Sequence, residues 1–396
     1  MNESNMNNQI VPSRRVQNVQ EYYFSRKLKE IAKMTADGAD IISLGIGGPD
    51  RMPSQEVIET LTAEAGKEGN HSYQSYVGLP QLREAFAAWY KKYYDVILNP
   101  ESEILPLIGS KEGILHISMA FLNPGDGVLV PNPGYPTYTS VSRLVEAQVY
   151  KYDLTEKNGW YPDFDELEKL PLDKIKLMWV NYPHMPTGAP ARIDVFEKLV
   201  DFGKKHGIVI AHDNPYSFIL NPEPVSLLQI PGAMDIALEL NSLSKSHNMA
   251  GWRVGMVASN PRFISWVLKV KSNIDSGQFK PLMLAAAKAL EADMDWYRQL
   301  NSIYAERRKI AEEIMTALGC RFDPQQKGLF LWGRIPDDAQ DSETFADNIL
   351  YNKHVFLTPG FIFGEQGQRY IRISLCAPSS KMKEALDRIL TLTPNS

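Results

Sequence analysis

The feature that most constrains the fold is a series of short apolar runs, each followed at once by polar residues. The runs do not alternate between apolar and polar side chains, and they lie at residues 128–130, 177–180, 208–211, 236–240 and 254–258. A strand buried on both faces, as in a mostly parallel sheet covered by helices, shows this continuous pattern. We therefore expect an α/β fold whose large domain has three layers, helix–sheet–helix, around a mostly parallel sheet.

Polar residues follow three of these runs at the point where each predicted strand ends. They are Asn181, His212, Asp213, Asn241 and Ser242. Parallel strands bring their carboxyl ends to one edge of the sheet, and ligands of open α/β sheets bind beyond that edge. The sequence therefore predicts a ligand site built from these strand ends.

The remaining periodicities predict helices and a smaller second domain. Helical periods cover residues 16–34, 82–94, 111–122 and 293–318, and two further strands are expected within residues 321–335 and 369–375. Residues 1–15 are Asn-rich and are expected to be poorly ordered. We expect a large domain at residues 50–285 and a flexible N-terminus at residues 1–15. A small α+β domain is expected to combine residues 16–49 with residues 286–396.

Composition excludes several classes of partner. The formal net charge is −5 and the basic residues are scattered, which argues against nucleic acid or an anionic membrane as a partner. Cys320 and Cys376 form no CxxC pair and cannot build a disulfide framework, so a reducing cytoplasm is expected. Neither a signal peptide nor an apolar run of roughly 20 residues is visible. The histidines lack ligand spacing, so no metal site is expected and His116 is interpreted as a packed side chain.

Lys245 is the strongest candidate nucleophile. It follows the run at 236–240 in the string Ser242-Leu243-Ser244-Lys245, and burial there would lower its pKa, as amine catalysis requires. A single lysine is more often an ordinary solvated side chain. The string also matches the S-x-x-K pattern of serine β-lactamase-like acylases, although their SDN and KTG strings do not occur in the chain. A covalent β-lactam adduct on Ser242 would support that alternative.

Two further strings could line the same cavity. Asp213 and Tyr216, three residues apart after a predicted strand, can face one site, although an aspartate there could simply cap a turn. Gly109, Ser110 and Lys111 begin a predicted helix, where free amides form an anion site or, more simply, a helix cap. The GxxxxGK[ST] spacing is missing, so a nucleoside triphosphate is not indicated.

Taken in order, the motifs resemble those of the class I/II aminotransferases of fold type I, which use pyridoxal 5′-phosphate (PLP). The resemblance covers nearly the whole chain from about residue 20. The strings that carry it are GIGGPD (45–50), YQSYVGLPQLREA (73–85), GSKEGI (109–114), PNPGYPTY (131–138), PTG (186–188), DNPY (213–216), SLSKSHNMAGWRVG (242–255) and PGFIFGEQGQRYIRIS (359–374). A random chain would not supply this set at these intervals.

The resemblance implies roles for the reactive groups around the cofactor. Lys245 would hold PLP as a Schiff base and move the proton between the substrate Cα and the cofactor. Asp213 would pair with the pyridinium nitrogen, Tyr216 would bond the ring O3′ and Tyr135 would stack on the ring.

The same resemblance implies how the anionic groups are held. The phosphate would be bound by Gly109, Ser110, Lys111, Ser242 and Arg253. Arg372 and the backbone N–H of Gly47 would bind the substrate carboxylate. Tyr73 would reach the phosphate of the other subunit, which implies a homodimer with shared sites.

Met185 departs from the family pattern. The family usually has Asn-Pro-Thr-Gly here, and its asparagine bonds both O3′ and the substrate carboxylate. In this chain the string is Met185-Pro186-Thr187-Gly188, and a thioether has no hydrogen to donate. Met185 is thus expected beside the cofactor, without the usual polar contacts.

The function implied is the transfer of an amino group between an L-amino acid and a 2-oxo acid by a ping-pong mechanism. A PLP-dependent C–S lyase that works by β-elimination is the nearer alternative, and a non-catalytic PLP-binding module is a distant one. The motifs do not specify the substrate side chain, whose pocket is expected around residues 22–24 and 361–363.

Overall fold

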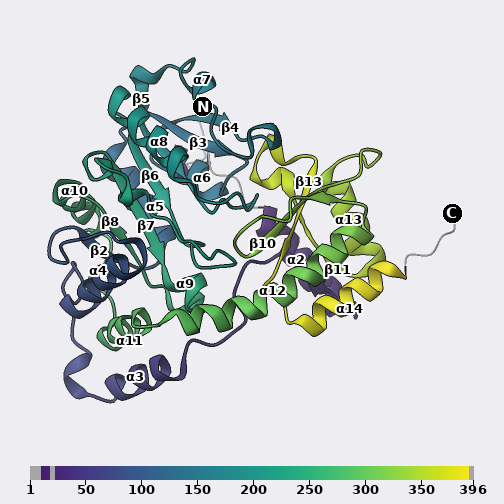
Figure 1. The fold of residues 1–396 in the computed structure, drawn as a ribbon, viewed down its shortest axis with the longest axis horizontal. Coiled ribbons are helices and arrows are strands. Elements are labelled where there is room, and N and C mark those ends of the chain that lie inside the picture. Colours follow the sequence, from purple (N-terminus) through teal and green to yellow (C-terminus); the bar gives the residue numbers. More distant parts are fainter. Residues whose placement is uncertain (1–9, 18–22, 392–396) are drawn as a thin grey trace, which may run out of the picture.

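The computed structural model describes residues 10–17 and 23–391. Most of the predicted flexible segment 1–15, and residues 18–22 of the first predicted helix, lie outside these residues. The described chain packs as a larger part around a central sheet and a smaller part beside it (Figure 1). Within residues 10–17 and 23–391, no helix combines the length and apolar character needed to cross a membrane.

The central sheet of the larger part is mostly parallel, as predicted. Its strand order is β2-β8-β7-β6-β5-β3-β4, and β8 runs antiparallel to both of its neighbours. The strands are β2 (Ile104–Leu107), β3 (Gly127–Asn132), β4 (Gln148–Asp153), β5 (Ile175–Val180), β6 (Val209–Asp213), β7 (Ala237–Ser242) and β8 (Gly255–Ala258). Every predicted run forms a strand, but β2 was not among the predicted runs, and neither was β4. Strand β4 pairs only with β3 and is mostly exposed or half-buried, so it carries no continuous apolar run.

Helices cover both faces of this sheet, which explains the continuous apolar runs. In β5, Leu177 and Trp179 pack into one core and Met178 and Val180 into the other. One face is covered by α5 (Ser110–Phe121), α6 (Pro136–Leu144) and α10 (Pro261–Lys271). The opposite face is covered by α4 (Pro80–Tyr94), α8 (Ile193–His206) and α11 (Lys280–Leu290). The predicted three-layer α/β architecture is confirmed.

The smaller part combines the N-terminal segment with the C-terminal third of the chain. An antiparallel sheet has the order β12-β13-β10-β9, and β1 pairs in parallel with β11. These strands are β1 (Ile42–Ser43), β9 (Arg321–Phe322), β10 (Phe330–Arg334), β11 (Val355–Phe356), β12 (Thr358–Pro359) and β13 (Tyr370–Ser374). The core includes Ile42 and Leu44 together with side chains of the C-terminal strands and helices.

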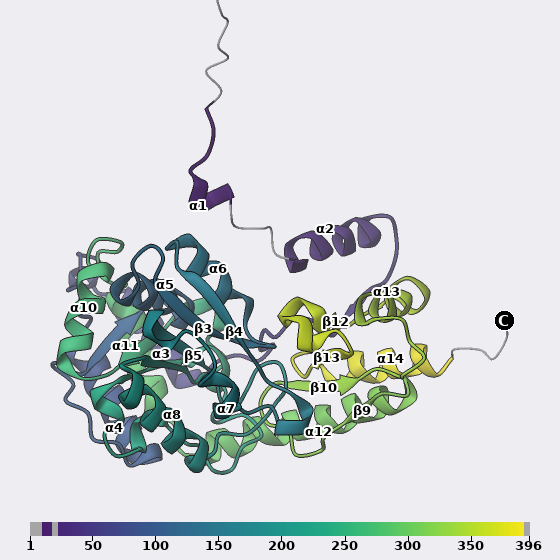
Figure 2. The same cartoon turned by 90° about the horizontal axis from the view of Figure 1, so that it is seen from above.

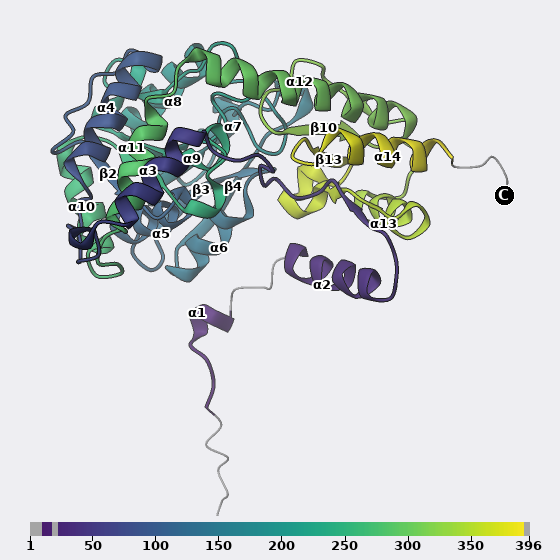
Figure 3. The same cartoon turned by 90° about the horizontal axis from the view of Figure 1, so that it is seen from below.

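Four helices frame the smaller part and its junction with the larger one, and they are α2 (Tyr23–Ala36), α12 (Met294–Ala317), α13 (Ser342–Lys353) and α14 (Ser379–Leu390). The helix α3 (Gln55–Ala65) packs instead on α11 of the larger part. The long α12 runs along both parts, with Tyr297 in the larger core and Leu300 in the smaller one (Figure 2). Seen from below, α2 lies along the smaller part beside α13 (Figure 3). The domain bounds at residues 50 and 286 stay a prediction.

A buried carboxylate joins two central strands. Glu239 of β7 lies opposite His212 of β6, and its Oε2 is 2.8 Å from His212 Nδ1. The same oxygen accepts a 2.8 Å hydrogen bond from the Leu227 N–H. Its Oε1 accepts hydrogen bonds of 2.8 Å from Tyr90 Oη and from Ser226 Oγ. The charge is fully enclosed, and both oxygens are satisfied.

We expect Glu239→Ala to destabilise the fold strongly. The substitution leaves four buried polar groups without their acceptor, and removal of one partner from such a site costs about 3–5 kcal/mol. The midpoint of thermal unfolding should therefore fall by several degrees. Glu313→Ala, which removes an exposed carboxylate of α12, is the matched control and should leave the midpoint nearly unchanged. Equal midpoints for the two variants would contradict this account.

Candidate active site

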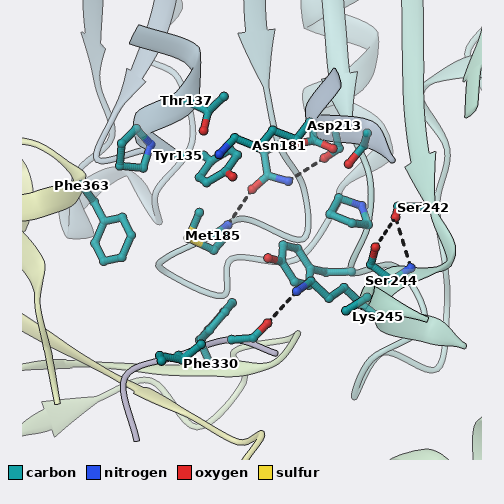
Figure 4. Close-up of a pocket in the computed structure, with 18 of the residues that line it drawn as sticks. Tyr135, Thr137, Asn181, Met185, Asp213, Ser242, Ser244, Lys245, Phe330 and Phe363 are labelled. Atoms are coloured by element: carbon teal, nitrogen blue, oxygen red, sulfur yellow. Dashed lines mark hydrogen bonds between the residues drawn. The ribbon is translucent and has the colours of Figure 1, made fainter. Parts of the chain in front are cut away.

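A cavity of about 640 Å³ lies beyond the carboxyl ends of β5, β6 and β7, facing the smaller part (Figure 4). Asn181, Asp213 and Ser242, which end or follow these strands, all line it. These strand-end residues therefore lie together at one cavity, as predicted. Predicted site residues in the lining are Gly47, Ser110, Lys111, Tyr135, Met185, Asp213, Tyr216, Ser242, Lys245, Arg253 and Arg372.

Two predicted residues lie outside the lining. Gly109 caps α5 with a φ of 76°, and a Cβ there would lie 2.3 Å from Arg253 Nη2. Glycine thus lets the guanidinium approach the helix start. Tyr73 is 90% exposed on the surface, so this chain's own cavity does not use it. Its contact with a second subunit stays a prediction.

Lys245 is half-buried in the short helix α9 (Leu243–Ser246), directly after β7. Its Nζ donates a 2.6 Å hydrogen bond to the carbonyl of Gly47, so the N-terminal segment closes over the amine. Burial lowers the pKa of Lys245, because the charged ammonium is poorly solvated there. A larger fraction of the amine is unprotonated at neutral pH, as a nucleophilic lysine requires.

Asp213 lies at the end of β6 with one oxygen bonded and one free. Tyr138 Oη donates a 2.9 Å hydrogen bond to Oδ2, whereas buried Oδ1 has no hydrogen-bond partner among the described residues. Burial raises the pKa of Asp213 to about 6, although the Tyr138 bond acts in the opposite direction. An unpaired buried carboxylate oxygen suits a protonated ring nitrogen, so Asp213 fits the pyridinium end of PLP.

Sequence reasoning missed Tyr138, although it closes the string PNPGYPTY. Its hydroxyl contacts Asp213 from α6, 75 residues away in the chain. Tyr135, from the same string, lines the cavity with its ring 5.6 Å from that of Tyr138. Tyr216 also lines the cavity, and burial raises its pKa, so its hydroxyl stays protonated and can donate a hydrogen bond.

One end of the cavity is built to hold an anion. The α5 helix begins at Ser110 without any side-chain cap, which leaves its first amides available to a ligand. The Arg253 guanidinium lies against this start, and Ser242 and Ser244 add hydroxyls. Twelve residues of α5 supply a helix dipole whose positive end points here. These groups fit a phosphate.

At the other end lies Arg372 of β13, a buried cation without an acidic partner among the described ion pairs. Its Nη2 donates a 2.9 Å hydrogen bond to the Gly45 carbonyl. The guanidinium carbon is 3.9 Å from the ring centroid of Phe330 and 4.7 Å from that of Phe363. Burial lowers the pKa of Arg372 to about 10, which leaves it charged at neutral pH. Such a group fits a substrate carboxylate.

Met185 lies beside this arginine. Arg372 Nη1 is 3.2 Å from Met185 Sδ, and the Met185 backbone N–H donates to Asn181 Oδ1 at 2.8 Å. Asn181 Nδ2 also donates to the Asp213 carbonyl at 2.5 Å, so this amide is held by the backbone. Asn181 was predicted as a strand-end residue of the site, but its anchoring role was not. The approach of Met185 to the cofactor oxygen stays a prediction.

His116 is fully buried, as expected of a packed side chain, but it has two acidic neighbours. One ligand atom each of His116, Glu112 and Asp275 lie within 4.8 Å of one another. Lys271 Nζ is 2.8 Å from Asp275 Oδ1 and supplies a positive charge to this group. We draw no metal site from it, and the expected absence of a metal stays a prediction.

Comparison with known proteins identifies the class. A family model described as aminotransferase class I and II matches residues 39–389. An LL-diaminopimelate aminotransferase of Dehalococcoides mccartyi is 39% identical over 379 residues, which cover 95% of this chain and 97% of that protein. The corresponding enzyme of Oleidesulfovibrio alaskensis is 41% identical over 374 residues, with coverages of 94% and 96%.

Solved structures agree. A substrate-bound structure of BacF from Bacillus subtilis has a TM-score of 0.92 and 35% identity, and the match covers 97% of this chain and 98% of that one. The fold is that of the PLP-dependent transferases of fold type I, and members of the class I and II family depend on PLP. The chain belongs to the class I and II aminotransferases, enzymes that transfer nitrogenous groups. The acylase alternative for Ser242 is thereby excluded.

We expect Asp213 to make the apoprotein less stable as the pH rises. Its pKa is raised from 3.8 to about 6, so the folded protein holds a proton that the unfolded chain releases. The corresponding stability, on the order of 3 kcal/mol, is present below about pH 4 and lost as the pH rises through 6. Asp213→Asn should remove this part of the pH dependence in thermal unfolding of the apoprotein.

The control is Asp173→Asn, which changes an exposed aspartate and should leave the wild-type dependence in place. If the Asp213→Asn protein followed the wild-type curve between about pH 4 and pH 7, the assignment of the shift to Asp213 would be wrong.

Proposed function

We propose that the chain moves an amino group from an L-amino acid to a 2-oxo acid in two successive half-reactions, with Lys245 as the lysine that carries PLP. The observation that supports this most directly is the placement of Lys245. A half-buried lysine of lowered pKa shares one cavity with an unpaired carboxylate oxygen of Asp213 and with the uncompensated charge of Arg372.

Each end of the cavity has a binding task. The α5 start, Ser242 and Arg253 would hold the phosphate, and Arg372 with the backbone of Gly47 would hold the substrate carboxylate. Asp213 would keep a proton on the ring nitrogen, supported by the hydrogen bond from Tyr138. These contacts fix the reacting groups against one another before any bond changes.

Lys245 performs the proton transfer. PLP, when bound, supplies an electron sink for the negative charge that develops at the substrate Cα. Lys245 Nζ accepts the proton from that carbon, which its lowered pKa favours. The N-terminal segment at Gly47 and the rings of Phe330 and Phe363 keep water away from this point. Tyr216 would hold the ring O3′ through its protonated hydroxyl.

Three broader features belong to the same proposal. Residues 50–285 would form the PLP-binding domain, with residues 16–49 and 286–396 as the small domain. The enzyme would act in the cytoplasm, in keeping with its two buried free cysteines. It would be a homodimer in which Tyr73 of each chain serves the other chain's site. The names of its relatives make LL-diaminopimelate one candidate amino donor.

Borohydride reduction of the holoenzyme should attach one pyridoxyl group to the peptide that contains Lys245, as read by mass spectrometry. Lys111 also lines the cavity and serves as the internal comparison in the same digest. Lys245→Ala should abolish turnover but retain bound PLP, because Asp213 and the phosphate site remain. A label on Lys111, or no label on either lysine, would refute the assignment of Lys245.

Shared sites predict complementation between inactive variants. After subunit exchange, a mixture of Lys245→Ala and Tyr73→Ala should recover activity, because one site of each mixed dimer has both residues. Lys245→Ala mixed with Asp213→Ala is the control, since both residues belong to one chain's cavity and each mixed site would lack one. Proven exchange without recovery in the first mixture would show that Tyr73 does not serve the neighbouring site.

A further inference from the structure

The positive charges of the cavity are few and are divided between its two ends. The described lining residues that carry a positive charge are Lys111, Lys245, Arg253 and Arg372. Arg253 lies against the start of α5, where Lys111 is the second residue, and Lys245 is the proposed PLP lysine. Among the described lining residues of this chain, Arg372 is then the cation left for substrate carboxylates. Residues 18–22, which precede α2 and are not described, contain no lysine or arginine in the sequence.

The surroundings of Arg372 are apolar. Its guanidinium lies over the rings of Phe330 and Phe363, and the Phe24 ring is 6.0 Å away. Phe363 lies on the side of Met185 away from Ser242 and Ser244 (Figure 4). A substrate whose carboxylate meets Arg372 would therefore direct its side chain along aromatic surface.

The N-terminal segment extends this apolar surface. Phe24 and Leu28 of α2, together with Ile46, line the cavity. The α2 helix is tied to α13 by Lys27, whose Nζ is 3.0 Å from Asp347 Oδ1. Because Lys27, the buried lysine of the helix, is paired with Asp347, the face of α2 towards the cavity presents hydrocarbon. Rings and aliphatic chains gain most from such a surface.

Met185 completes the surface at the position where the family usually has an amide. Its thioether is a weak acceptor and lies 3.2 Å from Arg372 Nη1, so it adds no donor for a second polar group of the substrate. A flexible thioether adapts its shape to large apolar groups. A thioether in place of the amide therefore favours apolar substrate side chains, as the aromatic rings do.

From these contacts we propose that the amino donor is an L-amino acid with one carboxylate and a large apolar or aromatic side chain. The proposal rests on the aminotransferase reaction above and names its substrate class. In the described lining of this chain, the second carboxylate of a dicarboxylic donor would meet no further cation, and burying it there is costly. LL-diaminopimelate would also need an acid for its distal ammonium group, and Asp213 is the acidic residue in the described lining.

Binding of unreactive analogues to the holoenzyme tests this directly. The probes are 3-phenylpropionate, a monocarboxylate with an aromatic ring, and glutarate, a dicarboxylate, both titrated by calorimetry. We expect 3-phenylpropionate to bind at least about tenfold more tightly. Equal or tighter binding of glutarate would overturn the proposal. Neither probe has an amino group, so the measurement does not depend on amino transfer.

Two variants locate the effect in the apolar surface. Phe24→Ala should weaken 3-phenylpropionate by about tenfold, and an unchanged affinity would show that this surface is not the side-chain site. Leu28→Lys places a cation at the cavity and should shift the preference towards glutarate. Leu390→Lys is the matched control, because it adds the same charge at an exposed leucine of α14, outside the cavity lining. The same shift in both lysine variants would overturn the assignment.

Half-reactions separate this proposal from the one on which it rests. Phenylalanine and leucine should convert bound PLP to its pyridoxamine form faster than aspartate, glutamate or LL-diaminopimelate. If no amino acid reacts although 3-phenylpropionate binds tightly, the proposed function fails and the binding preference stands. If LL-diaminopimelate is the fastest donor, the aminotransferase reaction stands and the proposed substrate class is wrong.

Discussion

Burial of the central sheet on both faces is the constraint on which the rest of the structure depends. Because Leu177 and Trp179 enter one core while Met178 and Val180 enter the other, these strands have no face on which a polar side chain can meet water. A polar group inside the sheet must be paired completely, as Glu239 is. Groups that need a ligand can be placed only where strands end, and the chemistry collects along that edge.

The cavity at this edge contains charged groups that the described residues leave partly without an oppositely charged partner. Asp213 has a buried oxygen without a partner among the described residues, and burial lowers the pKa of both Lys245 and Arg372. These groups cost stability unless a ligand meets them. In the proposed function, a cofactor with a basic ring nitrogen and a substrate with a carboxylate would supply the opposite charges. The same groups that lower the stability of the empty site would then select these ligands.

The larger part alone does not complete the site. Gly47 accepts the hydrogen bond from Lys245 and Gly45 accepts one from Arg372, although both glycines precede the first strand of the large sheet. Phe330 and Arg372 come from the small antiparallel sheet. The cavity therefore exists only where the N-terminal segment, the sheet edge and the C-terminal strands meet. Its shape depends on how the two parts pack against each other.

The sequence by itself determined the parallel sheet, its strand ends and the family of the chain, because apolar periodicity and short motifs are local properties. Those strand ends placed Lys245 and Asp213 correctly at one cavity. The edge strand β4 escaped prediction because half-exposed strands carry mixed side chains. Only the tertiary structure decided the bond from Tyr138 to Asp213 and the apolar surroundings of Arg372, since such contacts join residues far apart in the chain and follow from packing.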